Sequence, residues 1–340
     1  MTDIAKTLSA LPRAELAHLP TPIERLERLT TTIGGPSIIV KRDDCTGLGM
    51  GGNKVRKLEF LLADAMAKGA DTVVSGGVTQ SNHIRQTAAA CAKVGLGCHL
   101  AVMDGRVPKV DADYYETGNI FLDGLFGAKL EAIAWGADRN ALLPGIADRL
   151  TREGKKPYIV PYGGSNVLGT MGYVQFVIEL LRQLNDAELT IDAIVHASGS
   201  AGTQAGILAG VTALAPDLPV IGIDIDAEPE RVHADVTRLY HETCDYLDIT
   251  DRLPPKRIEV VAGYAGDGYG LITDGMTEAV DLAGRLEGLL LDPVYSGKGF
   301  AGLIGLIRAG RFKPTDRVLF IHTGGTPALF AYRSAFAKRV

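Results

Sequence analysis

The chain has 340 residues, of which 46% are hydrophobic and 22% are charged, and its formal net charge is −5. This length is about twice the ~150 residues of a typical domain, and the composition is typical of a globular protein with a sizeable core rather than of a disordered chain. No run of lysine and arginine forms a basic stripe, so we expect no nucleic-acid partner.

The sequence shows neither the pattern of a secretion signal or membrane span nor the cysteine spacing of a disulfide framework or metal site. The N-terminal segment lacks the apolar core of a secretion signal, and no stretch approaches the ~20 apolar residues of a membrane span. The four cysteines, Cys45, Cys91, Cys98 and Cys244, show no CxxC pairing, which argues against a disulfide framework or a metal site. We therefore expect a cytoplasmic protein with no membrane association and no bound metal.

Short apolar runs rich in β-branched residues alternate with longer amphipathic stretches along the chain. We expect strands at 37–40, 72–74, 99–102, 194–196, 220–225 and 317–322. We expect helices at 55–68, 82–94, 141–153, 169–184, 203–215 and 277–287. This alternation predicts an α/β protein with parallel-rich sheets. The polar segment 228–258 shows weak periodicity, and we interpret it as a long excursion from the main sheet.

Glycine is enriched and clustered, with 41 residues in the chain, well above a usual share of about 7%. Three of the clusters follow the expected strands 72–74, 194–196 and 317–322. Ligands of parallel α/β sheets bind at the carboxyl ends of strands, and glycine lets the backbone approach a ligand closely. The clusters therefore predict one site assembled from several loops.

The glycine-rich stretch 47–52 precedes Asn53 and Lys54. It satisfies G-x-G-x-x-G, but six residues separate it from the preceding strand, so the dinucleotide interpretation is weak. It is not a P-loop either, because Asn53 interrupts the motif and Val55 replaces its Ser/Thr. We expect a loop that delivers Lys54 to a helix N-terminus, where the dipole disfavours a cation and keeps the amine nucleophilic. The alternative is a solvated loop lysine.

Two further segments join an expected strand to an expected helix. In the segment 80–83, Ser81 and Asn82 either cap the helix or help to hold an anionic group of a ligand. The segment 199–203, with sequence GSAGT, presents several backbone N–H groups at a helix N-terminus, which suits a terminal phosphate monoester. A reactive lysine, a phosphate cradle and hydroxyls at strand ends together indicate a pyridoxal-phosphate (PLP) site.

Six motifs, in this order, resemble a family of PLP enzymes of the tryptophan-synthase-β type. They are KRDD at 41–44, GGNKVRKLE at 51–59, QSNH at 80–83, GSAGT at 199–203, DPVY at 292–295 and HTGG at 322–325. The family is that of the aminocyclopropane-carboxylate (ACC) deaminases and D-cysteine desulfhydrases, with the L-cysteate sulfo-lyases as close relatives. The resemblance covers about residues 19–332.

The resemblance implies a fold type II enzyme, with two α/β domains of parallel-rich twisted sheets and PLP in the cleft between them. We expect residues 1–52 and 165–340 to form a large PLP-binding domain and residues 53–164 a small domain. We also expect a homodimer that acts on a small amino-acid substrate.

The resemblance also implies a role for each site residue. Lys54 would bind the cofactor covalently and later move the α-proton, and Ser81 would bind the substrate carboxylate. Tyr295 would stack near the cofactor and the substrate, and Tyr269 would face the reacting carbon. Asn82 would bind the phenolic oxygen of PLP, and Thr323 its pyridine nitrogen. The phosphate would be held by Gly199, Ser200, Ala201, Gly202 and Thr203.

One departure helps to choose a reaction within the family. Ring-opening deaminases are expected to carry a glutamate after the DPVY tyrosine, next to the pyridine nitrogen, where this chain has Ser296. A neutral hydroxyl leaves a weaker electron sink, which is sufficient when a good leaving group sits on the β-carbon.

Ser296 therefore favours a PLP-dependent carbon–sulfur lyase. The reaction would be an α,β-elimination of the D-cysteine desulfhydrase or L-cysteate sulfo-lyase type, giving pyruvate, ammonia and sulfide or sulfite. ACC deaminase and a PLP-binding protein without turnover are the alternatives. Arg56, Lys57, Arg85 and Lys298 are candidate ligands for a sulfonate.

Overall fold

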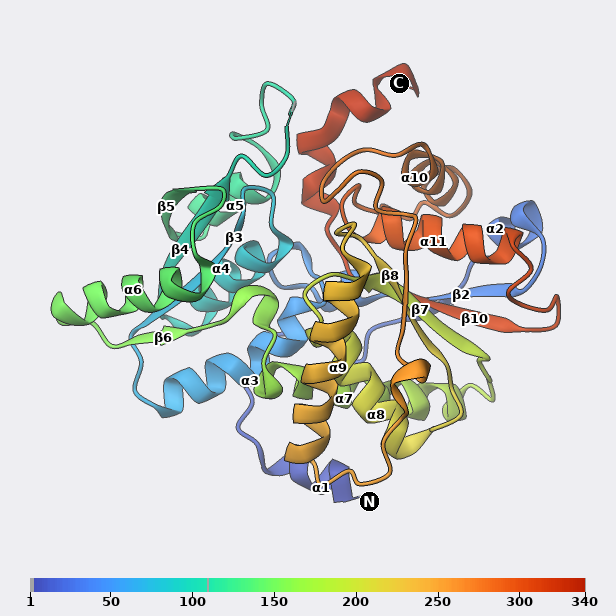
Figure 1. Cartoon of the computed structure of the whole chain (residues 1–340), viewed down its shortest axis with the longest axis horizontal. Helices are drawn as coiled ribbons and strands as arrows, with labels where there is room; N and C mark the ends of the chain where they lie inside the picture. The colour runs from blue at the N-terminus through green and yellow to red at the C-terminus, as the bar shows by residue number, and fades with distance from the viewer. Residues whose placement is uncertain (1–2, 109, 340) are drawn as a thin grey trace.

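The computed structural model describes residues 3–108 and 110–339. The chain folds into two β-sheets, and helices cover both faces of each sheet (Figure 1). The six strands of the larger sheet lie in the order β1 (Ile23–Arg25), β2 (Ser37–Lys41), β10 (Arg317–Ile321), β7 (Ala193–Ser198), β8 (Val220–Asp224) and β9 (Glu259–Val261). Only the β1–β2 pair is antiparallel within these residues.

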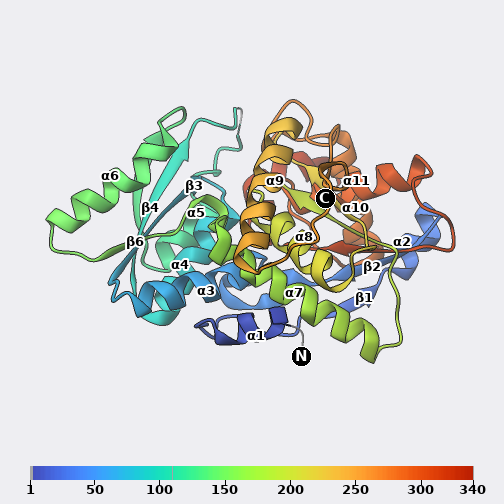
Figure 2. The same cartoon turned by 60° about the horizontal axis from the view of Figure 1, so that its bottom comes forward.

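The smaller sheet is parallel throughout. Its order is β5 (Lys129–Ala134), β4 (Gly97–Asp104), β3 (Thr72–Val78) and β6 (Pro157–Ile159). The two sheets lie at opposite ends of the molecule in both views (Figure 2). The expected α/β fold with parallel-rich sheets is thereby confirmed.

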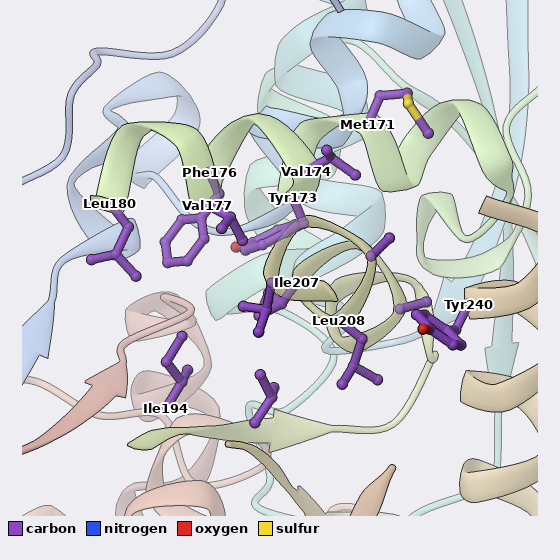
Figure 3. Packing of buried hydrophobic residues seen from close by; sticks show 14 of the residues in the cluster. Met171, Tyr173, Val174, Phe176, Val177, Leu180, Ile194, Ile207, Leu208 and Tyr240 are labelled. Carbon is purple, nitrogen blue, oxygen red and sulfur yellow. The ribbon is translucent and has the colours of Figure 1, made fainter. Parts of the chain in front are cut away.

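Helices cover both faces of the larger sheet. One face carries α1 (Asp3–Ala10), α7 (Val167–Asp186), α8 (Gly202–Leu214) and α9 (Pro229–Tyr246), and the other carries α2 (Glu27–Ile33), α10 (Asp274–Glu287) and α11 (Ser296–Arg308). Tyr173 and Val177, four positions apart on one face of α7, pack against α8 at Gly206 and Gly210 (Figure 3). This packing fixes where α8 begins, and α8 begins at the candidate site.

The smaller sheet packs against α3 (Lys54–Ala67), α4 (Asn82–Val94) and α5 (Gly118–Leu125) on one face and α6 (Arg139–Arg152) on the other. Short 3₁₀ segments complete the chain: η1 (Asp43–Thr46), η2 (Leu48–Met50), η3 (Tyr162–Gly164), η4 (Pro255–Arg257) and η5 (Thr326–Arg339). None of the helices within the described residues has the length and apolar character needed to cross a bilayer.

The expected elements occur at their expected places, with ends that differ by a few residues, whereas the interpretation of 228–258 was wrong in one respect. This segment contains the 18-residue helix α9. Its buried residues Val232, Val236, Leu239 and Thr243 recur every three or four positions, so the periodicity is clear, and β9 then returns to the sheet. The expected domain boundaries at 52/53 and 164/165 stay a prediction.

A buried ionic cluster joins α3 to α7 and to β2. The Arg56 guanidinium lies 2.9 Å from Asp43 Oδ1 and 2.9 Å from Glu179 Oε1, and Lys41 Nζ lies 2.6 Å from the same Glu179 oxygen. Arg56 and Asp43 are 1% and 0% exposed. Because charges this deeply buried tolerate little displacement of their partners, the cluster fixes the start of α3, where Lys54 lies.

Candidate active site

The carboxyl ends of β3, β7 and β10 open onto one cavity, as expected for parallel sheets. The inner part of the cavity lies among the loops that follow these strands and the start of α3. The outer part, of about 400 Å³, extends from Lys54 and Ser81 to Tyr269 and Arg106. These loops belong to both sheets, so both contribute to the site.

Lys54 is the first residue of α3 and lies in both parts of the cavity. The side-chain oxygen of Gln86 accepts hydrogen bonds from the backbone N–H groups of Lys54 (2.8 Å) and Val55 (3.1 Å). Gly52 has φ +129, and a Cβ there would lie 2.6 Å from Gln86, so this turn requires glycine. Burial lowers the pKa of Lys54 to about 8. A substantial neutral fraction of the amine near pH 7–8 makes it a competent nucleophile.

The turn from β7 into α8 forms a cradle of backbone N–H groups, the anion cradle, at residues 199–203. Ala201 has a positive φ of 64°, and the Gly202 N–H donates to the carbonyl of Ser200 (2.8 Å). No side chain caps α8, so the next N–H groups of its first turn are open to a ligand. A Cβ on Gly202 would lie 2.7 Å from Ser165 Oγ and 2.8 Å from Lys57 Nζ. The cradle therefore depends on the absence of a side chain at Gly202.

Lys57 contributes a second amine beside the anion cradle, which the sequence did not reveal as part of a phosphate site. Its Nζ donates to the carbonyl of Gly163 (3.1 Å), and burial, followed by the nearby Lys54, lowers its pKa well below the ordinary value. An anion bound in the cradle would favour the protonated form of Lys57. The helical spacing of Lys54 and Lys57 was the available signal, because residues i and i+3 share a helix face.

Ser81 and Asn82 both reach the cavity from the start of α4. Ser81 caps this helix, because its Oγ accepts the N–H of His83 (3.2 Å), and its own O–H remains available as a donor. The Asn82 oxygen accepts from the side-chain amide of Asn119 (2.9 Å), which leaves the Asn82 NH₂ group to donate into the cavity. Capping and ligand binding are therefore compatible at these two residues.

His83, the next residue of the same motif, lines both parts of the cavity with a fixed tautomer. Its Nε2 lies 2.9 Å from Ser75 Oγ, whose own hydrogen goes to the carbonyl of Val160 (2.8 Å). Nε2 therefore carries the proton, and Nδ1 is a buried acceptor with no partner among the described residues. Burial, followed by Lys54 and Lys57, lowers the pKa of His83 well below its ordinary value, so the ring is neutral.

Tyr269 and Tyr295 form a pair on the outer wall. Their hydroxyl oxygens are 2.6 Å apart, and their ring centres are 5.6 Å apart with the planes at 76°. Burial raises the pKa of both hydroxyls above the ordinary value. Both hydroxyls are therefore neutral at physiological pH, and because one donates to the other, one O–H of the pair is available to a ligand.

Thr323 lines the inner cavity, whereas Ser296 lies behind it. The Ser296 hydroxyl is 2.6 Å from Oδ1 of Asp292 and 3.2 Å from the carbonyl of Gly324, and the residue is fully buried. The Asp292 carboxylate accepts three backbone N–H groups at the start of α11. No carboxylate occurs among the described residues that line the inner cavity.

Three of the four basic residues considered as sulfonate ligands are directed elsewhere. Arg56 lies in the buried ionic cluster, and Arg85 donates to backbone carbonyls of the loop 49–51. Lys298 donates to the carbonyls of Ala265 (2.7 Å) and Gly268 (2.9 Å).

The expectation that these three residues bind a sulfonate was therefore wrong, because each cation is already paired inside the protein. The outer cavity contains Arg106 instead, which the sequence did not single out. Within the described residues, no three histidine, cysteine or acidic side chains gather where a metal ion could bind.

Comparison with known proteins gives one family. Residues 14–324 match the protein family described as "Pyridoxal-phosphate dependent enzyme". A solved structure described as "Crystal Structure Analysis of the ACC deaminase homologue" shares 37% identity over 100% of both chains, with a TM-score of 0.89. A pyridoxal 5'-phosphate-dependent aspartate racemase shares 17% identity over 95% of this chain and 94% of that chain, with a TM-score of 0.66, which shows a similar fold alone.

Proposed function

The chain belongs to the fold type II family of pyridoxal-phosphate-dependent enzymes that includes the ACC deaminases and D-cysteine desulfhydrases, and from this premise we propose that it is a carbon–sulfur lyase. Its cofactor is pyridoxal 5'-phosphate. The proposed reaction is an α,β-elimination on a cysteine-like amino acid that gives pyruvate, ammonia and sulfide or sulfite.

The residues of the inner cavity fit this cofactor. The anion cradle, with Lys57 beside it, has the donors and the space that a phosphate monoester needs. Lys54 presents the amine that would hold the aldehyde carbon, Asn82 an amide donor for the phenolic oxygen, and Thr323 a hydroxyl for the pyridine nitrogen. When bound, the cofactor supplies the electron sink that makes the substrate α-proton acidic.

The chain's own residues supply binding and proton transfer. The free O–H of Ser81 donates to the substrate carboxylate and so orients the α-carbon. Lys54 Nζ, whose pKa of about 8 is close to physiological pH, takes the α-proton and holds it. The hydroxyls of Tyr269 and Tyr295 are neutral because burial prevents their ionisation, and the O–H of the pair that is not used between them faces the β-substituent as a donor.

The observation that carries the choice of reaction is the lack of a carboxylate among the described residues of the inner cavity. Thr323 offers a neutral hydroxyl there, and Ser296, behind it, is bonded to Asp292 and Gly324. A neutral partner does not keep the pyridine nitrogen protonated as a carboxylate does. This environment supports elimination of a good leaving group over a reaction that must store charge on the cofactor.

ACC deamination is the second candidate, supported by the 37% identical structure named as an ACC deaminase homologue. Binding of PLP without turnover is the third, and the presence of Lys54, Ser81 and Tyr295 in one cavity argues against it. We also propose a cytoplasmic homodimer, which size-exclusion chromatography with light scattering and cell fractionation would test.

A substrate panel tests the proposed reaction. The purified holoenzyme is given both enantiomers of cysteine and cysteate, β-chloroalanine and ACC, and pyruvate, sulfide, sulfite and the four-carbon oxo acid from ACC are measured separately. We expect pyruvate from β-chloroalanine and in equal amounts with sulfide or sulfite from a sulfur-bearing substrate. Equal or greater kcat/KM on ACC would make the deaminase the better assignment, and a holoenzyme inert to every compound would favour the binding protein.

A further inference from the structure

Arg106 lies in the outer cavity, on the loop that follows β4, next to the proposed catalytic tyrosines. Its guanidinium carbon is 4.0 Å from the centre of the Tyr269 ring and 4.8 Å from that of Trp135. One edge of the guanidinium pairs with Asp226 at 3.0 Å. Stacking on two rings and pairing at one edge restrict the orientation of this side chain.

The remaining donors of Arg106 are available to a ligand. Asp226 accepts from Nη2, and Arg106 has no other hydrogen-bond or ion-pair partner among the described residues. Asp226 also pairs with Arg231 at 2.5 Å. Arg231 pairs in addition with Glu228 and with Asp235 (3.1 Å), whereas Asp226 is the one carboxylate partner of Arg106 among the described residues. The donors of Arg106 that do not face Asp226 therefore remain beside Tyr269 in the outer cavity.

We infer that Arg106 binds the substituent on the β-carbon of the substrate, and that this substituent is a sulfonate, so the substrate is cysteate rather than cysteine. This inference rests on the proposed carbon–sulfur lyase activity and names its substrate class. A planar guanidinium matches two oxygens of a sulfonate. A neutral thiol offers it no charge to bind.

The elimination itself strengthens this contact. The α-proton leaves to Lys54, the Cα–H electrons form the Cα=Cβ bond, and the C–S pair leaves with sulfur as sulfite. The charge on the sulfur group thereby changes from −1 in the sulfonate to −2 in sulfite. The elimination needs no external oxidant or reductant. A fixed cation at the leaving group binds the transition state more tightly than the substrate, which raises kcat.

Two substitutions at this position and one control separate recognition from structural support. Arg106→Met removes the charge, keeps the length and leaves Asp226 paired with Arg231, and Arg106→Lys keeps a charge without the planar fork. Arg238→Met is the matched control, because Arg238 lines the same cavity but is 58% exposed and pairs with Glu242. The readouts are kcat/KM of the holoenzymes on cysteate and on β-chloroalanine, which carries no sulfonate.

We expect Arg106→Met to lower kcat/KM on cysteate about 100-fold, whereas kcat/KM on β-chloroalanine should change only a few-fold. The kcat/KM of Arg106→Lys on cysteate should lie between those of wild type and Arg106→Met. Arg238→Met should have the kcat/KM values of wild type on both substrates. Equal losses on both substrates would show that Arg106 merely supports Tyr269, and a wild-type preference for cysteine over cysteate would also overturn the inference. Both outcomes leave the lyase proposal standing.

A binding measurement decides the inference even if the lyase proposal fails. The holoenzymes are titrated with 3-sulfopropanoate and with propanoate, and the near-visible absorbance of the cofactor reports binding. Wild type should bind 3-sulfopropanoate more tightly, and Arg106→Met should remove that difference. Equal affinity of wild type for the two acids would contradict the inference, whereas inertness toward every sulfur substrate with intact sulfonate binding would contradict the lyase reaction alone.

Discussion

Lys54 Nζ lies 3.2 Å from Ser200 Oγ, so the amine at the start of α3 meets the anion cradle at the start of α8. The helix α3 packs on the smaller sheet and α8 on the larger one. The proposed site therefore exists only while the two sheets, each with its own helices, keep their relative position. The buried ionic cluster of Arg56, Asp43, Glu179 and Lys41 holds this position.

Replacing Lys54 tests the point of cofactor attachment. We expect Lys54→Ala to lose the near-visible absorbance of a lysine-bound cofactor together with turnover, because no other lysine of the described residues lines either part of the cavity. Lys68→Ala, on the exposed end region of the same helix, should retain both. Borohydride reduction followed by peptide mapping should label the peptide that contains Lys54, and a label on another lysine would refute the assignment.

The pH dependence of cofactor uptake follows from the lowered pKa of Lys54. Only the neutral amine attacks an aldehyde, and burial places the pKa of Lys54 at about 8 instead of 10.5. The rate of PLP uptake by the cofactor-free protein should rise about tenfold per pH unit below pH 8 and level off above it. Stopped-flow absorbance measures this rate, and a midpoint near pH 10 would show that Lys54 behaves as an ordinary surface lysine.

A side chain at Gly202 should weaken cofactor retention. In Gly202→Val the new Cβ would meet Ser165 Oγ at 2.7 Å and Lys57 Nζ at 2.8 Å, in the wall of the cradle. Loss of charge-assisted bonds to the phosphate should cost about 2–4 kcal/mol, or roughly 30- to 1000-fold in Kd. Equilibrium dialysis measures it. Gly284→Ala, where a Cβ would meet open space, is the control and should leave Kd unchanged.

Removing the charge of Glu179 should destabilise the whole fold. Glu179→Gln would leave Arg56 and Lys41 buried with one carboxylate fewer, at a cost of about 3–5 kcal/mol in urea unfolding. The matched control is Glu278→Gln, which removes an exposed pair with Arg308, and this change should cost less than about 1 kcal/mol. A similar decrease of the free energy of unfolding in the two variants would contradict the stabilising role of the buried ionic cluster.

The same glutamate predicts how stability depends on pH. Burial opposes ionisation of Glu179, but Arg56 and then Lys41 outweigh it and lower the pKa to about 2 from 4.5. A carboxyl with a lower pKa in the folded state stabilises the protein above pH 4.5, and this contribution disappears as the pH falls toward 2. Between pH 4.5 and pH 2 the free energy of unfolding of the wild type should therefore fall by about 3 kcal/mol more than that of Glu179→Gln. Urea unfolding at each pH measures this difference.

Local sequence determined the elements of this fold and the turns that could bind a phosphate. The segment 199–203 consists of small residues between an apolar strand and an apolar helix, so its backbone donors had to be exposed wherever the helix lay. The capping position of Ser81 follows in the same way from the start of α4. Such features depend on neighbours in the chain, and these are fixed before any packing is known.

Tertiary packing decided which charged side chains belong to the site. Arg56 and Arg106 are both arginines near motifs, yet Arg56 is held by Asp43 and Glu179 inside the protein, whereas Arg106 stacks on Tyr269 in the cavity. Their partners lie up to 163 positions away in the chain, as for Arg106 and Tyr269. Lys57 became a candidate phosphate ligand only when α3 met the turn into α8. A long side chain takes the direction that its distant partners and its desolvation allow, and neither is written in the residues beside it.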